Sequence, residues 1–315
     1  MQRIAAIDCG TNSLRLLIAD VSDHGLADVL RRMEIVRLGA GVDRTKQLDE
    51  AALRRTRAVL VDYAQLLKLH RVEVVRMVAT SAVRDAANAE ELRSIVRDVL
   101  GIEVTVLNGE TEAQLSYLGA AGGLDPAGGP FLVLDIGGGS TEVVYGETPN
   151  KPSAAMSMDI GAVRLTERYF RDDPPTLEQV TLAEREIRAA MAKTGAAFLR
   201  CARTVVGVAG SVTTVVAITE GLTRYESDRI HHARVTPQQV SEIADWLLTA
   251  PHAARAAVKV IHPGRVDVIA AGALILREVL QAMDASELLC SEHDILDGVA
   301  LAAVGEDFLE LHADQ

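Results

Sequence analysis

An apolar run that ends in aspartate and then turns through glycine and small polar residues occurs twice in this chain. The first copy ends in Asp8-Cys9-Gly10-Thr11-Asn12-Ser13, and the second, 127 residues later, in Asp135-Ile136-Gly137-Gly138-Gly139-Ser140-Thr141. A β-rich run follows each copy, so the pattern predicts two hairpins with tight turns. Glycine allows positive φ angles and a close approach of the backbone to a ligand. Because N–H groups in such turns bind phosphate oxygens, the repeat predicts two loops that hold a phosphate chain from two sides.

The two copies supply candidate ligands for phosphate and for a metal ion. Asp8 and Asp135 carry the oxygen ligands that divalent cations such as Mg²⁺ prefer, although each aspartate could instead only cap its turn. Arg15 follows the first loop, and a guanidinium suits bidentate donation to phosphate. Glu142 follows the second loop and could orient the metal or a water molecule, or be a solvated strand residue. The candidate phosphate-binding residues of the loops are Thr11, Asn12, Ser13, Gly137, Gly138, Gly139, Ser140 and Thr141.

Composition excludes several classes of protein. With 315 residues, 49% hydrophobic and 24% charged, the chain is long enough for two globular domains. The net charge of −12 argues against nonspecific nucleic-acid binding, and 3% aromatic residues argue against a base-stacking platform. No apolar run reaches the roughly 18 residues that span a bilayer, and the N-terminus shows no signal-peptide pattern. We expect no membrane partner, and a cytoplasmic protein in which Cys9, Cys201 and Cys290 are reduced thiols.

Hydrophobic periodicity predicts an α/β protein made of two similar halves. The turn-rich stretch 122–130 marks the boundary, which gives domains 1–124 and 125–315. In the first half we predict strands over 3–8, 14–21, 28–38, 74–79 and 102–107, and helices over 48–69, 86–100 (with Gly101 as C-cap) and 110–121. In the second half we predict strands over 131–137, 141–146, 154–160, 204–207 and 288–290, and helices over 176–200, 212–219 and 295–310. Helical patterns also dominate from 238 to 283.

Together with the two loops, further segments resemble the exopolyphosphatase / guanosine pentaphosphate phosphohydrolase family, part of the superfold of sugar kinases, actin and heat-shock ATPases. These segments are 79–88 (ATSAVRDAAN), 107–113 (LNGETEA), 161–167 (GAVRLTE) and 207–214 (GVAGSVTT). The resemblance implies two ribonuclease-H-like (actin-like ATPase) domains with the active site in the cleft between them. It implies Mg²⁺-dependent release of terminal orthophosphate from inorganic polyphosphate, or removal of the 5′ γ-phosphate from guanosine pentaphosphate. A homodimer is possible.

The resemblance also assigns residues outside the two loops. Glu112 resembles the family's catalytic glutamate and is our candidate general base, with its neighbour Glu110 as the competitor. Both could instead be favourable charges at a helix N-terminus. Arg84, in the segment 79–88, is the better supported of the two candidate phosphate-binding arginines. Arg164, Arg168 and Arg265 are interpreted as surface arginines, and His231 and His232 as loop histidines.

The chain departs from many family members in two respects. We expect a short form without their additional C-terminal helical domain of the HD type. The segment 291–298 (SEHDILDG) replaces a commoner arginine-containing version. Because the acidic chain should repel a long polyanion, we expect a preference for short polyphosphate. The alternatives are a polyphosphate or nucleotide sensor with degraded catalysis, and a sugar kinase, for which we recognise no sugar site. No Walker A pattern is present.

Overall fold

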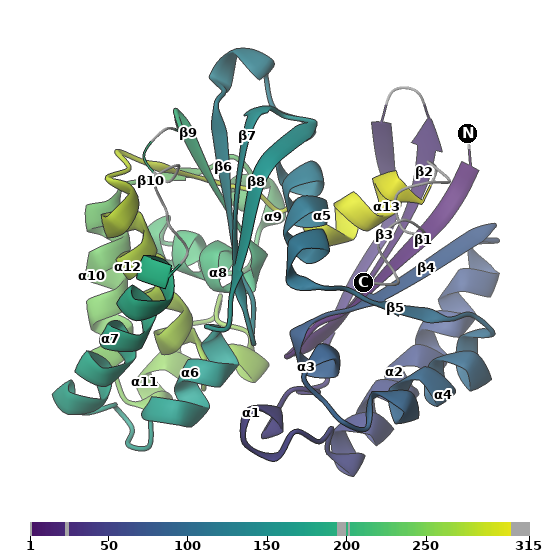
Figure 1. Cartoon of the computed structure of the whole chain (residues 1–315), viewed down its shortest axis with the longest axis horizontal. Helices are drawn as coiled ribbons and strands as arrows, with labels where there is room; N and C mark the ends of the chain where they lie inside the picture. Colours follow the sequence, from purple (N-terminus) through teal and green to yellow (C-terminus); the bar gives the residue numbers. More distant parts are fainter. Residues whose placement is uncertain (1, 23–24, 194–199, 201, 304–315) are drawn as a thin grey trace. The chain divides into compact units, whose positions relative to one another are not determined.

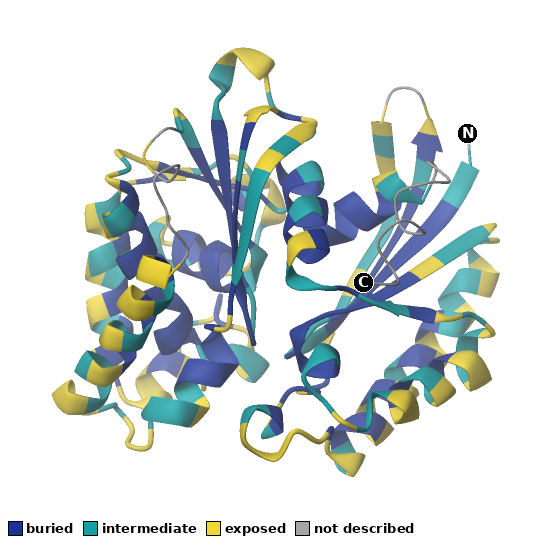
Figure 2. Cartoon of the chain, viewed as in Figure 1, coloured by how far each residue is buried: buried dark blue, intermediate teal, exposed yellow. Residues whose placement is uncertain are grey.

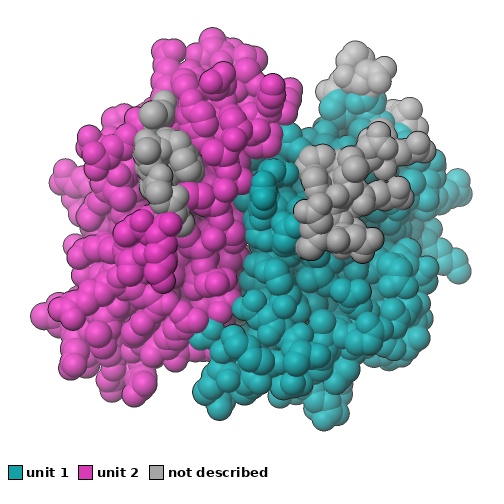
Figure 3. Space-filling view, viewed as in Figure 1, with its two compact units in different colours: residues 1–119, 295–315 teal, residues 120–294 magenta. Residues whose placement is uncertain are grey.

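The computed structural model describes residues 2–22, 25–193, 200 and 202–303 (Figure 1). The chain forms two compact units, one of residues 1–119 and 295–315 and one of residues 120–294 (Figure 3). This division differs from the predicted one, which gave residues 125–315 to the second domain. The closing helix belongs instead to the first unit, and the boundary falls at residue 119, within the helix that precedes the predicted turn.

The sheet of the first unit has the strand order β3-β2-β1-β4-β5. β1 pairs antiparallel with β2 and parallel with β4, and β2 pairs antiparallel with β3. The strands are β1 (Gln2–Cys9), β2 (Ser13–Ser22), β3 (Gly25–Ile35), β4 (Val74–Ala79) and β5 (Val104–Val106). The helices are α1 (Val42–Thr45), α2 (Glu50–Leu69), α3 (Ser81–Arg84), α4 (Ala89–Leu100), α5 (Gly109–Ala121, which runs past the boundary) and α13 (Ile295–Ala302).

Alternation along β1 gives this sheet two buried faces. Ala5, Ile7 and Cys9 point to one face and pack with residues of α2 and α4, while Ile4 and Ala6 point to the other. Figure 2 shows β1 and β2 as largely buried, whereas the edge strand β3 is intermediate or exposed. Asp8 has the same parity as Ile4 and Ala6, so its side chain lies on the face that carries α13.

α13 packs on the first sheet because its apolar residues complete that second face. Ile295, Leu296, Val299 and Ala300 are buried with Ile4, Ala6, Leu17 and Ala19. Asp297 is buried and forms an ion pair with Arg31 of β3, which anchors the helix to the edge strand. Gly298 allows a close approach to α5, because a Cβ there would lie 2.0 Å from the carbonyl oxygen of Leu115. The sequence predicted this helix but did not show which of the two sheets it packs on.

The second unit repeats this strand order and adds one edge strand, β10. Its sheet reads β10-β11-β9-β6-β7-β8, in which β6, β7 and β8 form an antiparallel meander and β6, β9 and β11 are parallel. Its strands are β6 (Phe131–Ile136), β7 (Thr141–Thr148), β8 (Lys151–Met158), β9 (Thr204–Val208), β10 (Arg234–Val235) and β11 (Leu288–Cys290). Its helices are α6 (Ala162–Tyr169), α7 (Leu177–Lys193), α8 (Ala209–Thr219), α9 (Ser227–Ile230), α10 (Pro237–Thr249), α11 (His252–Ala256) and α12 (Ile269–Met283), with 3₁₀ turns η1 (Pro126–Gly128) and η3 (Pro263–Arg265).

One large apolar core underlies this second sheet. Leu132, Leu134 and Ile136 of β6 pack with the buried faces of α8, α10 and α12. α10 begins at Thr236 through a capping box with Gln239, followed by proline at the first helical position. In both units three antiparallel strands precede parallel ones, so the predicted pair of ribonuclease-H-like domains is confirmed.

Most predicted elements are present, with differences at their ends. The predicted helix 86–100 is α4, which begins at Ala89, and Gly101 ends α4 in the left-handed conformation, φ 69°, as expected. The short helix α3 lies before this range and was not predicted. The predicted range 238–283 contains α10, α11 and α12 separated by turns, and α6 and β10 were not predicted. The predicted helix 176–200 corresponds to α7, which ends at Lys193, and residues 194–199 lie outside the described residues. Cys201 and residues 304–310 of the predicted closing helix also lie outside the described residues. None of the described helices could span a membrane.

The contact of α13 with α5 generates a stability prediction. Gly298→Ala places a methyl group against the carbonyl oxygen of Leu115, so we expect the protein to lose about 1–3 kcal/mol despite the better helix propensity of alanine. The matched control is Gly123→Ala, where a Cβ meets nothing within 4 Å. Thermal unfolding of both variants measures the effect. Equal unfolding temperatures would contradict the close approach.

Candidate functional site

The first predicted loop joins β1 to β2 and is held from behind by the segment that follows β3. The N–H of Gly10 donates to the carbonyl oxygen of Ser13 (3.0 Å), which closes the turn. The carbonyl of Thr11 accepts from the N–H of Gly39 (2.7 Å), and that of Asn12 accepts from the N–H groups of Val36 (3.1 Å) and Arg37 (2.9 Å). In a planar trans peptide the N–H points away from the carbonyl. The N–H groups of Asn12 and Ser13 therefore point away from this supporting segment.

The second loop, between β6 and β7, is built in the same way. The N–H of Gly137 donates to the carbonyl oxygen of Ser140, again at 3.0 Å. The carbonyl of Gly137 accepts from the N–H of Ala162 (3.0 Å), and that of Gly138 accepts from the N–H groups of Val163 (2.8 Å) and Arg164 (3.1 Å). The supporting segment again follows the third strand of its sheet. It turns the N–H groups of Gly138 and Gly139 to the side opposite α6.

The Arg164 side chain extends this support and was misjudged from the sequence. Its Nε donates to the carbonyl oxygen of Gly139 at 2.7 Å, and the residue is only 6% exposed, so it is not the surface arginine that we expected. The bond turns the N–H of Ser140 in the same direction as those of Gly138 and Gly139. Three consecutive amide donors on one side suit the oxygens of a bound anion.

Close backbone packing explains two glycines that were not singled out. A Cβ at Gly161 would lie 2.4 Å from the carbonyl oxygen of Gly138, and one at Gly39 would lie 2.2 Å from Cγ2 of Thr11. Any larger residue would push the supporting segment off its loop. Gly161 stood within the segment 161–167, so its signal was present, whereas nothing in the sequence pointed to Gly39.

The two copies differ at one pair of positions that face each other across the hairpin. Asp8 is paired in register with Arg15, and Asp135 is paired in register with Glu142. Side chains of directly opposite residues in an antiparallel pair lie on the same face. The first hairpin therefore presents an aspartate beside an arginine, and the second presents two carboxylates side by side.

Arg15 is engaged with the first aspartate. Its Nε and Nη2 donate to Oδ2 of Asp8 at 3.0 and 2.6 Å, and Asp8 is 3% exposed. The guanidinium predicted to bind phosphate thus also neutralises the predicted metal ligand. In the second hairpin Glu142 is 1% exposed and accepts from the hydroxyl of Ser157 at 2.7 Å, so it is not a solvated strand residue. Asp135 is 8% exposed.

Glu112 and Glu110 have different surroundings, although both lie in the first turn of α5. Glu112 is buried and its Oε2 accepts from Nη1 of Arg84 at 2.9 Å. The same Nη1 donates to the carbonyl oxygen of Leu107 at 2.7 Å, so Arg84 ties the glutamate to the end of the preceding strand region. Glu110 is exposed and accepts from Gln114 at 3.3 Å. The structure gives Glu112 the fixed orientation that a catalytic group needs.

Asn108 sets the start of α5 and was not predicted. Its side-chain Oδ1 accepts from the N–H of Thr111 at 2.8 Å, and its carbonyl accepts from the N–H of Glu112 at 3.0 Å. Asparagine is a preferred N-cap residue because it satisfies otherwise unbonded N–H groups of the first turn. The sequence Asn-Gly-Glu-Thr-Glu carried this capping signal.

Two loop hydroxyls are used inside the protein. Oγ1 of Thr141 donates to the carbonyl oxygen of Ile160 at 2.7 Å, and the residue is fully buried. Oγ1 of Thr11 lies 2.9 Å from the hydroxyl of Ser81 at the start of α3. The structure therefore gives the Thr141 hydroxyl a structural role. In the pair of Thr11 and Ser81 either hydroxyl could be the donor.

The residues present suit a magnesium ion bound together with phosphate. Among the described residues, no group of three or more histidine, cysteine, aspartate or glutamate side chains is arranged to hold a metal. Mg²⁺ in phosphate sites is usually bound by only one or two carboxylates, with substrate oxygens and water completing the shell. The two neighbouring carboxylates of Asp135 and Glu142 fit that requirement better than Asp8, which already has Arg15.

The structure also shows the surroundings of Cys9, Arg168 and Arg265. Cys9 is fully buried, and burial, with a smaller contribution from Asp8, raises the pKa of its thiol well above the usual range. A thiol that stays protonated is a poor nucleophile. Arg168 forms an ion pair with Glu186. Arg265 was expected on the surface, but its guanidinium lies against Gly210, where a Cβ would be 1.9 Å from Nη1.

Comparisons with known proteins agree with this construction. The model of the Ppx/GppA phosphatase family matches residues 17–306. Exopolyphosphatase 2 of Mycobacterium tuberculosis is 47% identical over 97% of this chain and 99% of its own length. The crystal structure of the Aquifex aeolicus member of the Ppx/GppA family is 33% identical, covers 97% of this chain and 98% of its own, and superposes with a TM-score of 0.80. A guanosine-5′-triphosphate,3′-diphosphate pyrophosphatase of Photobacterium profundum is 39% identical over 57% of this chain and 36% of its own length. The duplicated loops, the order of the strands and these matches together place the chain in the Ppx/GppA phosphatase family.

Proposed function

We propose that this protein is an exopolyphosphatase, a hydrolase that releases terminal orthophosphate from inorganic polyphosphate. The observation that carries the proposal is the duplicated loop, in which the same backbone hydrogen bonds hold two sets of N–H donors. Such donors suit the oxygens of a phosphate chain. The 47% identity to a protein named exopolyphosphatase supports the same substrate.

Hydrolysis of the terminal anhydride requires a water molecule, a base and charge stabilisation. Glu112, oriented by Arg84, takes a proton from the attacking water. The oxygen of that water forms the new bond to the terminal phosphorus while the bridging P–O bond breaks, and the electron pair stays on the shortened chain. The N–H groups of Gly138, Gly139 and Ser140 stabilise negative charge on the phosphate oxygens. A bound Mg²⁺, held by Asp135 and Glu142 with Asp8 as a further candidate, would neutralise phosphate charge.

A second candidate is the removal of the 5′ γ-phosphate from guanosine pentaphosphate. The similarity to the pyrophosphatase of Photobacterium profundum favours it. The two reactions break the same kind of bond and need the same groups. Phosphate release from short polyphosphate, long polyphosphate, guanosine pentaphosphate and ATP, measured side by side with Mg²⁺, distinguishes them. Release from none of the four would support the sensor alternative.

We further propose that the protein is cytoplasmic and that it forms a homodimer. The two described cysteines, Cys9 and Cys290, are buried free thiols, which suits a reducing compartment. Sedimentation of the purified protein measures its oligomeric state.

The first prediction of this assignment concerns the base. Glu112→Gln removes the proton acceptor and keeps the shape of the side chain, so we expect turnover to fall by about 10²–10⁴ while substrate binding is kept. Glu110→Gln is the matched control, because the two glutamates share a helical turn and differ in burial. Near-normal turnover of Glu112→Gln, with loss in Glu110→Gln, would transfer the role to Glu110.

The second prediction concerns the metal. Asp135→Asn removes one of the two neighbouring carboxylates. We expect it to raise the Mg²⁺ concentration needed for activity more than Asp8→Asn does. Asp20→Asn is the control, because Asp20 is also paired with an arginine on the first sheet (Arg3, 2.7 Å) but lies at the other end of β2. Mg²⁺ titrations of activity, with Mn²⁺ binding measured by electron paramagnetic resonance, report the effect. Unchanged titrations for both loop variants would refute metal coordination there.

The third prediction concerns chain length. The protein carries a net charge of −12, so at low salt a long polyanion should be repelled more than a short one. We expect kcat/KM to be higher for short polyphosphate, and added salt to narrow the difference because it screens long-range repulsion. Kinetics across chain lengths at two ionic strengths measure this. A preference for long chains that salt does not change would contradict it.

A further inference from the structure

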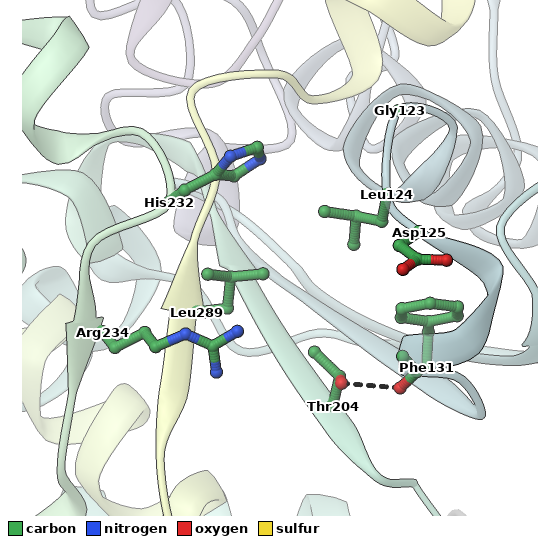
Figure 4. A pocket seen from close by; sticks show the side chains of 9 residues that line it. Gly123, Leu124, Asp125, Phe131, Thr204, His232, Arg234 and Leu289 are labelled. Carbon is green, nitrogen blue, oxygen red and sulfur yellow. Dashed lines mark hydrogen bonds between the residues drawn. The ribbon is translucent and has the colours of Figure 1, made fainter.

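A pocket of about 320 Å³ (Figure 4) lies in the second unit, at the end of the sheet where β6 and β9 begin. It is lined by Phe131 and Thr204, the first residues of the parallel strands β6 and β9. The loop 137–140 follows Ile136, the last residue of β6, which by the rise of a strand is about 17 Å from Phe131. The pocket is therefore separate from the phosphate loop, and it lies in the lower part of the size range of small-molecule sites.

One wall of the pocket is basic. It is formed by Arg234 of β10 and by His232, which precedes that strand. His232 has φ 65°, unusual for a residue other than glycine, and its N–H donates to the carbonyl oxygen of Cys290 at 2.7 Å, which fixes it beside β11. The Arg234 guanidinium forms an ion pair with Glu287, and its side chain is 53% exposed. It is accessible to a ligand from solution.

Burial and two neighbouring side chains disfavour the charged form of His232. Its ring stacks on His231 at 3.8 Å between centroids, and His231 lies 4.6 Å from His293. Partial desolvation, then the charges of His293 and Arg234, lower the pKa of His232. The nearby acidic groups are Glu287, on Arg234, Asp125, which lines the pocket, and Glu292, whose N–H donates to Nδ1 of His231 at 3.1 Å. A bound anion would favour the charged form of His232 and raise its pKa.

The opposite wall and the floor are mainly apolar. Figure 4 shows Leu124 and Phe131 across from His232 and Arg234, with Leu289 between the two walls. Asp125 lies above Phe131, where its carboxylate accepts from the N–H of Ala127 at 3.0 Å. Its negative charge would direct an anionic group toward the basic wall. A flat apolar body fits the space between Leu289 and the Leu124–Phe131 side.

We propose that this pocket binds a small organic anion, a planar apolar group that carries a phosphate, phosphonate or carboxylate, with the anion on Arg234 and His232 and the ring between Leu289, Leu124 and Phe131. An anion alone would not use the apolar wall, and an apolar ring alone would not use the basic wall. The pocket residues take no part in the proposed hydrolysis, so this proposal can be tested independently of the proposed function.

The test uses phenylphosphonate, which contains both parts and has no anhydride bond, with inorganic phosphate as the anion without a ring and benzoate as the carboxylate form. Histidine ring carbons of the full-length protein are labelled, and the His232 signal is assigned by its loss in His232→Gln. We expect a saturable shift of that signal and a raised pKa of His232. We expect phenylphosphonate to bind about tenfold or more tightly than inorganic phosphate, because the ring buries apolar surface.

The N–H groups of the phosphate loops could also bind the anionic probes. Variants of the pocket residues distinguish the two sites. Arg234→Gln should abolish the His232 response, and Arg229→Gln, a change of another exposed arginine outside the pocket, should keep it. Leu124→Ser should weaken phenylphosphonate and leave inorganic phosphate unchanged. The absence of a saturable shift, equal affinity for phenylphosphonate and phosphate, or a full response in Arg234→Gln would each overturn the proposal.

Discussion

Hydrogen bonds to the carbonyl oxygens of the two tight turns are the constraint on which both candidate loops depend. A turn that exposes several N–H groups on one side must have its carbonyls bonded on the other, because an unbonded buried carbonyl is costly. In each unit the segment after the third strand supplies these donors, residues 36–39 in the first and 162–164 in the second. The duplication therefore includes the loop and also its support. Gly39 and Gly161 are required because the support touches the loop itself.

The two copies differ in charge, and this difference assigns different roles to the two hairpins. Opposite the aspartate at the strand end, the first copy has Arg15 and the second has Glu142. An arginine beside Asp8 keeps that hairpin close to neutral, so it can accept phosphate oxygens without a cation. Two buried carboxylates side by side repel each other, and a divalent cation would relieve that repulsion. The second hairpin is thus the better candidate for the metal, although the two sequences look alike at Asp8 and Asp135.

The sequence predicted well what depends on local chemistry. Alternating apolar residues located the strands, and the repeat of Asp8 and Asp135 located the two turns at matching positions. It predicted poorly what depends on partners distant in sequence. Arg164 looks like any arginine of an amphipathic helix, and only the fold brings its Nε to Gly139. α13 follows the second sheet in the chain, yet its apolar face complements Ile4 and Leu17 of the first. Thr141 looked like a phosphate ligand, but its hydroxyl is used by Ile160, nineteen positions away.

Arg84 illustrates why charge alone does not assign a role. As a guanidinium in a family-like segment it was expected to bind phosphate, and the structure joins it to Glu112 and to the carbonyl of Leu107. Both contacts use Nη1, which fixes the guanidinium relative to the start of α5. An arginine fixed in this way would orient the base. Its loss would therefore disturb the geometry of Glu112 and lower turnover, whereas the loss of a simple phosphate ligand would affect binding alone.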